Sequence, residues 1–176
     1  ILIGLVGSEM CIRDSSYTIH TDLHTNTAYS SLATQITKIF PIALNTFIIP
    51  TIYGRFIFND GIPFMYSNVI GGEGYNPHYE QQIPFSGLPH TESTLKLLGN
   101  ARIQIRHKFH GKQYLTLSGN YAIHQNQFSN FLQGKKIYGT SIGYGYDSPL
   151  GPIEGFICYS NRTNKLGFYL NIGFGF

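Results

Sequence analysis

The chain has 176 residues, enough for one domain of ordinary size. Hydrophobic residues make up 42% of it and charged residues only 12%, whereas soluble domains usually carry about 25% charged residues. The net charge of +3 is small and scattered, which argues against a nucleic-acid partner. No apolar run approaches the roughly 18 residues of a transmembrane helix, and Cys11 and Cys158 lack the spacing of metal ligands.

The abundance of aromatic residues and glycine favours membrane-spanning β-strands. The sequence contains 13 Tyr, 13 Phe and 20 Gly. Strands of an outer-membrane barrel face lipid on one side and a polar lumen on the other, and about 9–11 residues suffice for each crossing. A soluble β-sandwich has a similar composition and remains the alternative.

The first residues look foreign to the rest of the chain. Residues 5–15 read LVGSEMCIRDS and resemble the translation of a sequencing-library transposase adapter. They lack the charged region and the small-residue cleavage site of a signal peptide. We therefore divide the chain into a non-native segment, 1–15, and a barrel segment, 16–176. We expect the gene to continue upstream, and we expect residues 5–15 to make few contacts with the strands.

In the first part of the barrel segment, Pro41 and Pro50 interrupt the apolar runs, so strand boundaries are loose. The predicted strands lie at about 16–24, 29–40, 43–59 and 62–70. Asp60 and Gly61 form a typical hairpin-turn pair.

The remaining strands show a clear period of two. They are predicted at 94–110, 113–125, 137–148, 152–161 and 165–176. In the last strand, every second residue from Leu166 to Phe176 is apolar, and the residues between them are small or polar or, in one case, Tyr. Phe156 interrupts the polar row of its strand. About eight antiparallel strands, with short turns alternating with the longer segments 71–93 and 126–136, are typical of an outer-membrane barrel.

Several polar residues could form sites, and each has a simpler interpretation. His20 and His24 are four residues apart, but no third metal ligand is near. His78 and His90 lie in the long segment, where we expect them to be solvated. The glycine-rich Gly71-Gly72-Glu73-Gly74 lacks the following Lys-Ser/Thr and helix of a phosphate-binding loop.

The strand at 94–110 carries a row of cationic side chains opposite its apolar row: Arg102, Arg106 and Lys108. In a barrel this row points into a wet lumen. The three residues could bind an anionic lipid or solute there, or they could form ion pairs between wall and loop. We assign no catalytic, cofactor-binding or metal-binding residue, and we do not expect this chain by itself to be an enzyme.

Two stretches resemble known proteins. Ser148-Pro149-Leu150-Gly151-Pro152-Ile153 and the terminal Phe176 resemble the end of the outer-membrane surface-antigen barrels, a superfamily that includes barrel-assembly proteins and two-partner-secretion transporters. Gly71-Gly72 and Pro84-Phe85-Ser86-Gly87 are more similar to the barrel domain of patatin-like phospholipases. The likeness covers residues 60–176 well.

The resemblance implies a barrel of about sixteen strands, of which this chain supplies the C-terminal half as an open or incomplete sheet. It places 71–93 between the eleventh and twelfth strands, as a loop that folds inward. The superfamily carries Arg-Gly at the tip of this loop, and this chain has Ser86-Gly87. A phospholipase would need a Gly-x-Ser-x-Gly nucleophile elbow at a turn from strand to helix. The letters of that motif occur at Gly139–Gly143, but inside the predicted strand 137–148, so the elbow itself would lie upstream.

The function implied is a membrane anchor or translocation pore in the outer membrane of a Gram-negative bacterium. Its expected partners are outer-membrane lipid and the barrel-assembly machinery, the latter through the C-terminal strand. A small self-contained pore or adhesin and a soluble β-sandwich binding module are the alternatives.

Overall fold

The computed structural model describes residues 11–22, 27–58, 66–73, 82–109, 111–149 and 151–173, with side chains from residue 30 onward apart from 129 and 130. The predicted turn at Asp60-Gly61, the histidines His24 and His78, and residues 174–176 lie outside these ranges.

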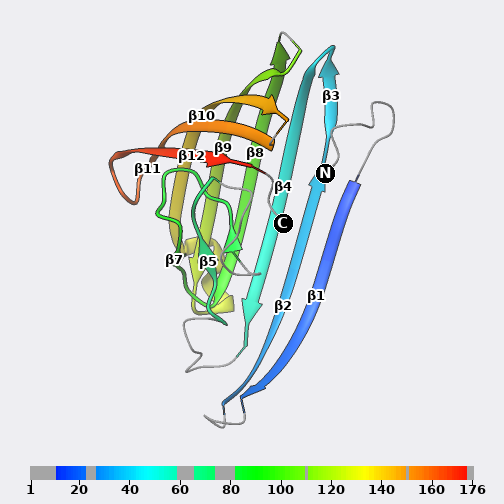
Figure 1. Cartoon of the computed structure of the whole chain (residues 1–176). Helices are drawn as coiled ribbons and strands as arrows, with labels where there is room; N and C mark the ends of the chain where they lie inside the picture. Colours follow the sequence, from blue (N-terminus) through cyan, green and yellow to red (C-terminus); the bar gives the residue numbers. More distant parts are fainter. Residues whose placement is uncertain are drawn as a thin grey trace.

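One large antiparallel sheet dominates the fold (Figure 1). Its main strands follow one another in chain order: β1 (Cys11–Asp22), β2 (Thr27–Lys38), β4 (Thr46–Ile57), β8 (Leu97–Phe109), β9 (Gln113–Gln125), β10 (Lys135–Ser148), β11 (Gly151–Ser160) and β12 (Leu166–Ile172). The short strand β3 (Phe40–Ala43) also pairs with β4. The path ends at β1 and β12, and no ladder joins them within the described ranges. The predicted open, all-β barrel half is therefore confirmed.

Smaller elements lie in the connections. Between β4 and β8, the strands β5 (Val69–Ile70), β6 (Gln82–Ile83) and β7 (Glu92–Ser93) form a three-stranded sheet. Between β9 and β10 lies a 3-10 helix, η2 (Phe128–Gln133), in a segment predicted to be a loop. No helix in the described part of the chain is both long and apolar enough to cross a membrane.

The two faces of the sheet differ as the alternation predicts. On the outer face, Ile142, Ile157 and Phe168 are 46%, 54% and 69% exposed. On the inner face, Ser118 and Ser141 are 6% and 7% exposed. A soluble sandwich would cover its apolar face with a second sheet, so that alternative is wrong for this fold. Exposed apolar side chains in this pattern are those that meet lipid in a barrel.

Phe156 breaks the polar inner row because β10 leaves space for its ring. A Cβ built on Gly143, its partner in the register, would lie 2.2 Å from the Phe156 ring. Gly145 makes room for Tyr114 in the same way, with the ring 2.3 Å from a built Cβ. These two glycines let large rings lie flat against the neighbouring strand.

Most strand boundaries differ from the prediction by a few residues, and three predicted strands differ more clearly. The predicted 29–40 strand ends at Lys38, and the predicted 43–59 strand is preceded by the separate strand β3. The chain turns at 44–45, where Asn45 adopts a positive φ of 69°, which Asn tolerates better than most residues. In the predicted 62–70 strand, Val69–Ile70 is the part seen as a strand, while 59–65 lie outside the described residues.

Residues 11–15 contradict the expectation that the first segment makes few contacts. They belong to β1 and pair with residues 34–38 of β2. The physical reason is that the edge of a sheet offers unpaired backbone groups, and these accept almost any extended segment. The pairing therefore does not decide where the segment comes from.

Candidate functional site

The connection between β4 and β8 folds back over the inner face of the sheet (Figure 1). Its described parts are 66–73 and 82–96, and the strands β5 and β7 lie in front of the barrel wall in this view. We call the described residues 66–73 and 82–93 the lumen loop. It connects the third and fourth main strands of the sheet, as the sequence implied.

Asn68 fixes the base of the lumen loop. Its Nδ2 donates hydrogen bonds to the carbonyl oxygens of Leu95 and Lys96, at 2.8 and 2.9 Å. Its Oδ1 accepts a hydrogen bond of 3.3 Å from Arg55 of β4. Because Asn68 is 1% exposed, these bonds join the loop to β4 and to the residues before β8 in a water-poor place.

An apolar cluster joins the lumen loop to the wall. The members from the loop and from the wall are all less than 9% exposed: Ile70, Ile83, Phe85 and Leu88, with Tyr53, Leu98, Ala122 and Ile137. Burial of this size is the main favourable term in packing one element on another. The loop is therefore packed on the wall rather than suspended in the lumen.

Ser86, at the loop tip, is completely buried and is hydrogen-bonded to two strands. Its hydroxyl accepts a hydrogen bond from Asn120 Nδ2 at 2.7 Å and donates one to Ser141 Oγ at 3.3 Å. Ser118 Oγ lies 3.2 Å away, in hydrogen-bond contact with both serines. Short polar side chains of β9 and β10 thus hold the loop tip against the wall.

Two glycines allow the tip to approach the wall this closely. Gly87 has φ +80°, and a Cβ built there would lie 2.3 Å from the carbonyl carbon of Tyr159. A Cβ on Gly139 of β10 would lie 2.0 Å from the carbonyl oxygen of Ser86. Only glycine fits either position, because both contacts are to backbone atoms that cannot move aside.

Glu73 and Arg102 connect loop and wall electrostatically. Their side chains are 0% and 8% exposed, and Arg102 Nη2 lies 3.0 Å from Glu73 Oε2. The expectation of a wall-to-loop pair is met by Arg102. The other two cations pair within the wall, Arg106 with Glu154 at 3.3 Å and Lys108 with Asp147 at 3.8 Å.

Of the four histidines considered in the sequence, the structure describes His20 and His90. His90 is exposed, but its ring stacks on Tyr169 with centroids 5.5 Å apart, so it is not simply solvated. His20 lies in β1, in register with Tyr29. Within the described residues, no three His, Cys, Asp or Glu side chains come together in a way that could hold a metal ion.

Comparison with known families gives one match. The model of the OMP85 superfamily matches residues 9–176, nearly the whole chain. The chain belongs to the OMP85 superfamily. A search of curated proteins found no match.

OMP85 proteins are outer-membrane β-barrel proteins of Gram-negative bacteria, and the open sheet described above is a barrel half of this kind. The lumen loop of this OMP85 chain carries Ser86-Gly87 at its docked tip. Sequence reasoning found the loop and its tip, but it missed Glu73. A lone acidic residue among glycines gives no signal that its partner lies on a strand 29 residues away.

Proposed function

We propose that this chain is the C-terminal half of a barrel that serves as a membrane anchor or translocation pore for a region preceding it in a longer protein. The docked lumen loop carries the proposal. It occupies the inner face through the apolar cluster, the Ser86 tip and the pair of Glu73 with Arg102. A lumen filled by its own loop suits a barrel that holds another domain at the membrane and opens only when the loop moves.

We further propose that the attached region is a patatin-like phospholipase or a related surface-antigen module. The stretch Pro84-Phe85-Ser86-Gly87, which resembles the patatin-linked barrels, supports this because it forms the docked tip. The absence of the Arg of Arg-Gly argues against polypeptide assembly or secretion by the usual route. The edge of β12 supports recognition by the barrel-assembly machinery, since a strand edge can pair with a partner strand.

A small self-contained pore or adhesin is the competing function. It would need β12 to pair with β1, and the sheet path ends at those two strands within the described residues. No observation therefore favours it.

The test replaces everything upstream of the complete barrel with a soluble reporter enzyme. The reporter is expected to remain in the outer-membrane fraction, resist carbonate extraction, and be released when residues 97–176 are deleted. A reporter that stays in the membrane without the barrel would refute the anchor. Phospholipase activity of the complete protein, abolished by changing the Ser of an upstream Gly-x-Ser-x-Gly motif, tests the attached domain separately.

A further inference from the structure

One histidine holds the segment 94–96, through which the lumen loop returns to β8. His124 lies near the end of β9, and its side chain is buried on the inner row, with 4% of the residue exposed. Its Nδ1 accepts a hydrogen bond of 3.2 Å from the backbone N–H of Leu95. The carbonyl oxygen of Leu95 accepts the hydrogen bond from Asn68 described above. Leu95 is therefore bound to β9 through its N–H and to the base of the loop through its carbonyl.

The hydrogen bond to Leu95 assigns the protonation state of the ring. A backbone N–H donates only to a nitrogen with a free lone pair, so Nδ1 of His124 is unprotonated and the proton of the neutral ring is on Nε2. A proton added to Nδ1 would turn this nitrogen into a donor that faces a second donor, the N–H of Leu95. The docked geometry therefore requires neutral His124.

The charges around His124 also oppose a second proton on the ring. Lys135 of β10 lies directly opposite His124 in the register. Arg55 of β4 belongs to the same cross-strand row, two strands away on the other side. Arg162 and Glu92, which pair with each other, also act on the ring electrostatically. Three cations and one carboxylate give surroundings that disfavour an imidazolium.

The other nitrogen of the ring does not compensate for this. Within the described residues, no hydrogen-bond partner reaches the buried Nε2 of His124. A carboxylate there would stabilise an imidazolium through a charge-assisted hydrogen bond. A protonated ring in the docked state would instead be a buried charge without that support, which is unfavourable compared with the same charge in water.

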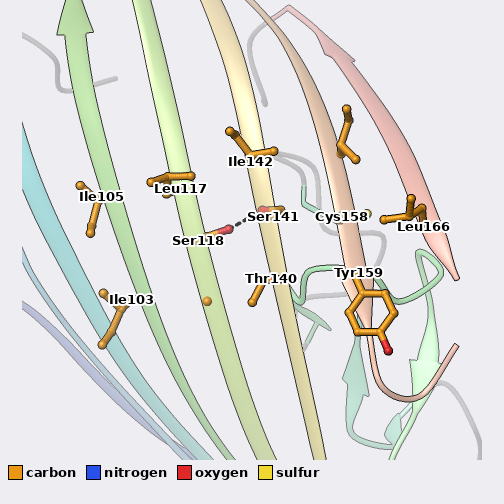
Figure 2. Close-up of a pocket in the computed structure, with 12 residues that line it drawn as sticks. Ile103, Ile105, Leu117, Ser118, Thr140, Ser141, Ile142, Cys158, Tyr159 and Leu166 are labelled. Atoms are coloured by element: carbon orange, nitrogen blue, oxygen red, sulfur yellow. Dashed lines mark hydrogen bonds between the residues drawn. The ribbon is translucent and has the colours of Figure 1, made fainter. Parts of the chain in front are cut away.

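The tip of the lumen loop has no comparable group. Ser86 is hydrogen-bonded to Ser118, Asn120 and Ser141, and Figure 2 shows the bond that joins Ser118 to Ser141 across β9 and β10. Serine and asparagine keep one protonation state throughout the physiological pH range, whereas histidine changes its charge within it. A response of the docked loop to pH should therefore begin at its base.

Release of the segment 94–96 would expose His124 to water, where a histidine titrates near pH 6.5, roughly as in a peptide. Because the docked ring takes up a proton less readily than the released ring, docking is strongest above about pH 6.5 and weakens as the pH falls below it. One proton is taken up for each release. Each pH unit below that value therefore multiplies the released population by up to about ten.

We propose that His124 is a pH-sensitive switch for the base of the lumen loop. The neutral ring binds Leu95 and holds the loop docked, and the protonated ring releases it. Release of the loop follows from these contacts alone. Only the further step, in which release opens a passage through the barrel, rests on the proposed pore function.

The experiment measures hydrogen–deuterium exchange of the complete protein in lipid vesicles at pH 8 and at pH 5.5. Peptides that cover 66–73 and 92–96 report on the base of the loop, and their own sequence is unchanged by substitutions at 124. At pH 8, the wild type and His124→Asn should exchange equally, because the Asn Oδ1 takes the place of Nδ1 as acceptor. At pH 5.5, these peptides should exchange up to about tenfold faster in the wild type than in His124→Asn.

Three further variants separate the switch from general effects of acid. His124→Leu has no acceptor and should exchange faster than His124→Asn by the same factor at both pH values. His107→Asn removes a histidine whose Nδ1 is hydrogen-bonded to Thr46 at 2.8 Å, on the neighbouring strand β8. His90→Asn removes a histidine of the loop itself. Both His107→Asn and His90→Asn should keep the acid response of the wild type.

Equal exchange of the wild type and His124→Asn at pH 5.5 would overturn the switch, as would loss of the acid response in His107→Asn. If His124→Asn does not fold, peptides of β10 and β11 in the wild type provide the reference at each pH. Base peptides that gain no exchange relative to them in acid would also overturn it. Conductance across planar bilayers tests the pore separately, because an acid response in exchange without one in conductance would contradict the pore and support the switch.

Discussion

Glu73 of the lumen loop and Arg102 of β8 form a buried ion pair across 29 residues of sequence. Removal of one partner leaves the other charge in a water-poor site, which costs about 3–5 kcal/mol in buried pairs. Glu73→Gln should therefore destabilise the docked loop, measured as faster proteolysis of the loop and a lower unfolding midpoint. Glu73→Leu/Arg102→Met, which removes both charges, should recover much of the loss.

The control for this prediction is Glu92→Gln. Glu92 pairs with Arg162 at 2.9 Å, but the two side chains are 28% and 44% exposed. Exposed pairs contribute about 1 kcal/mol or less. If Glu73→Gln had no larger effect than Glu92→Gln, the buried pair would not be holding the loop.

Gly87→Ala should detach the loop tip. The new Cβ would collide with the backbone of Tyr159, and it would also strain a backbone with φ +80°. The measurement is the rate of alkylation of Cys158 in a Cys11→Ser background. Cys158 lies on the inner row of β11, next to Tyr159 in the chain, and is only 2% exposed. Alkylation should become faster. Gly111→Ala is the matched control, because Gly111 has φ +64° but no neighbour within 4 Å of its Cβ.

Leu170→Arg should be far more costly than Asn171→Arg. Leu170 is 59% exposed on the lipid-facing row, while Asn171 faces the lumen in register with Glu154. An arginine on the lipid face costs about 2–4 kcal/mol near the bilayer midplane. Unfolding of the complete barrel in lipid vesicles measures the difference, and equal costs would reverse the assignment of faces.

Residues 16–176 alone should fail to form a stable transmembrane species. The edges at β1 and β12 would leave backbone groups unpaired in hydrocarbon, where each costs several kcal/mol. In refolding into vesicles, we expect aggregation or full protease sensitivity, in contrast to the complete barrel. A protease-resistant, heat-modifiable form of the fragment would instead favour the small self-contained barrel.

Resequencing of the locus without transposase adapters should give codons upstream of Ser16 that do not encode LVGSEMCIRDS. The codon-level likeness of residues 5–15 to an adapter motivates this prediction. The same residues found in an adapter-free read would make them native.

The sequence predicts the faces of the sheet well because the polarity of each side chain indicates whether it faces lipid or the lumen. The alternation from Leu115 to His124, and from Tyr138 to Tyr146, places every one of those residues on the correct face. The inward loop followed from the family resemblance. The position of η2 did not, because six residues with two Phe and one Leu have no decisive period.

What the sequence could not reveal are relations between distant positions. Ser86 has no local feature that predicts partners on β9 and β10, 32 and 55 residues away. Phe156 interrupts the polar row of its own strand, and the reason lies on another strand, where Gly143 stands opposite it. Such pairs are fixed by strand register, which a single strand does not encode.

The two rings that lie over Gly143 and Gly145, those of Phe156 and Tyr114, also fix the register of β10 against its two neighbouring strands. If β10 slipped by two residues in one direction, Phe156 would meet Ser141; in the other, Tyr114 would meet Asp147. Either slip places a side chain where a ring must lie. The stagger between strands determines the tilt and the diameter of a closed barrel. By fixing this stagger, Gly143 and Gly145 help to determine the diameter of the complete barrel.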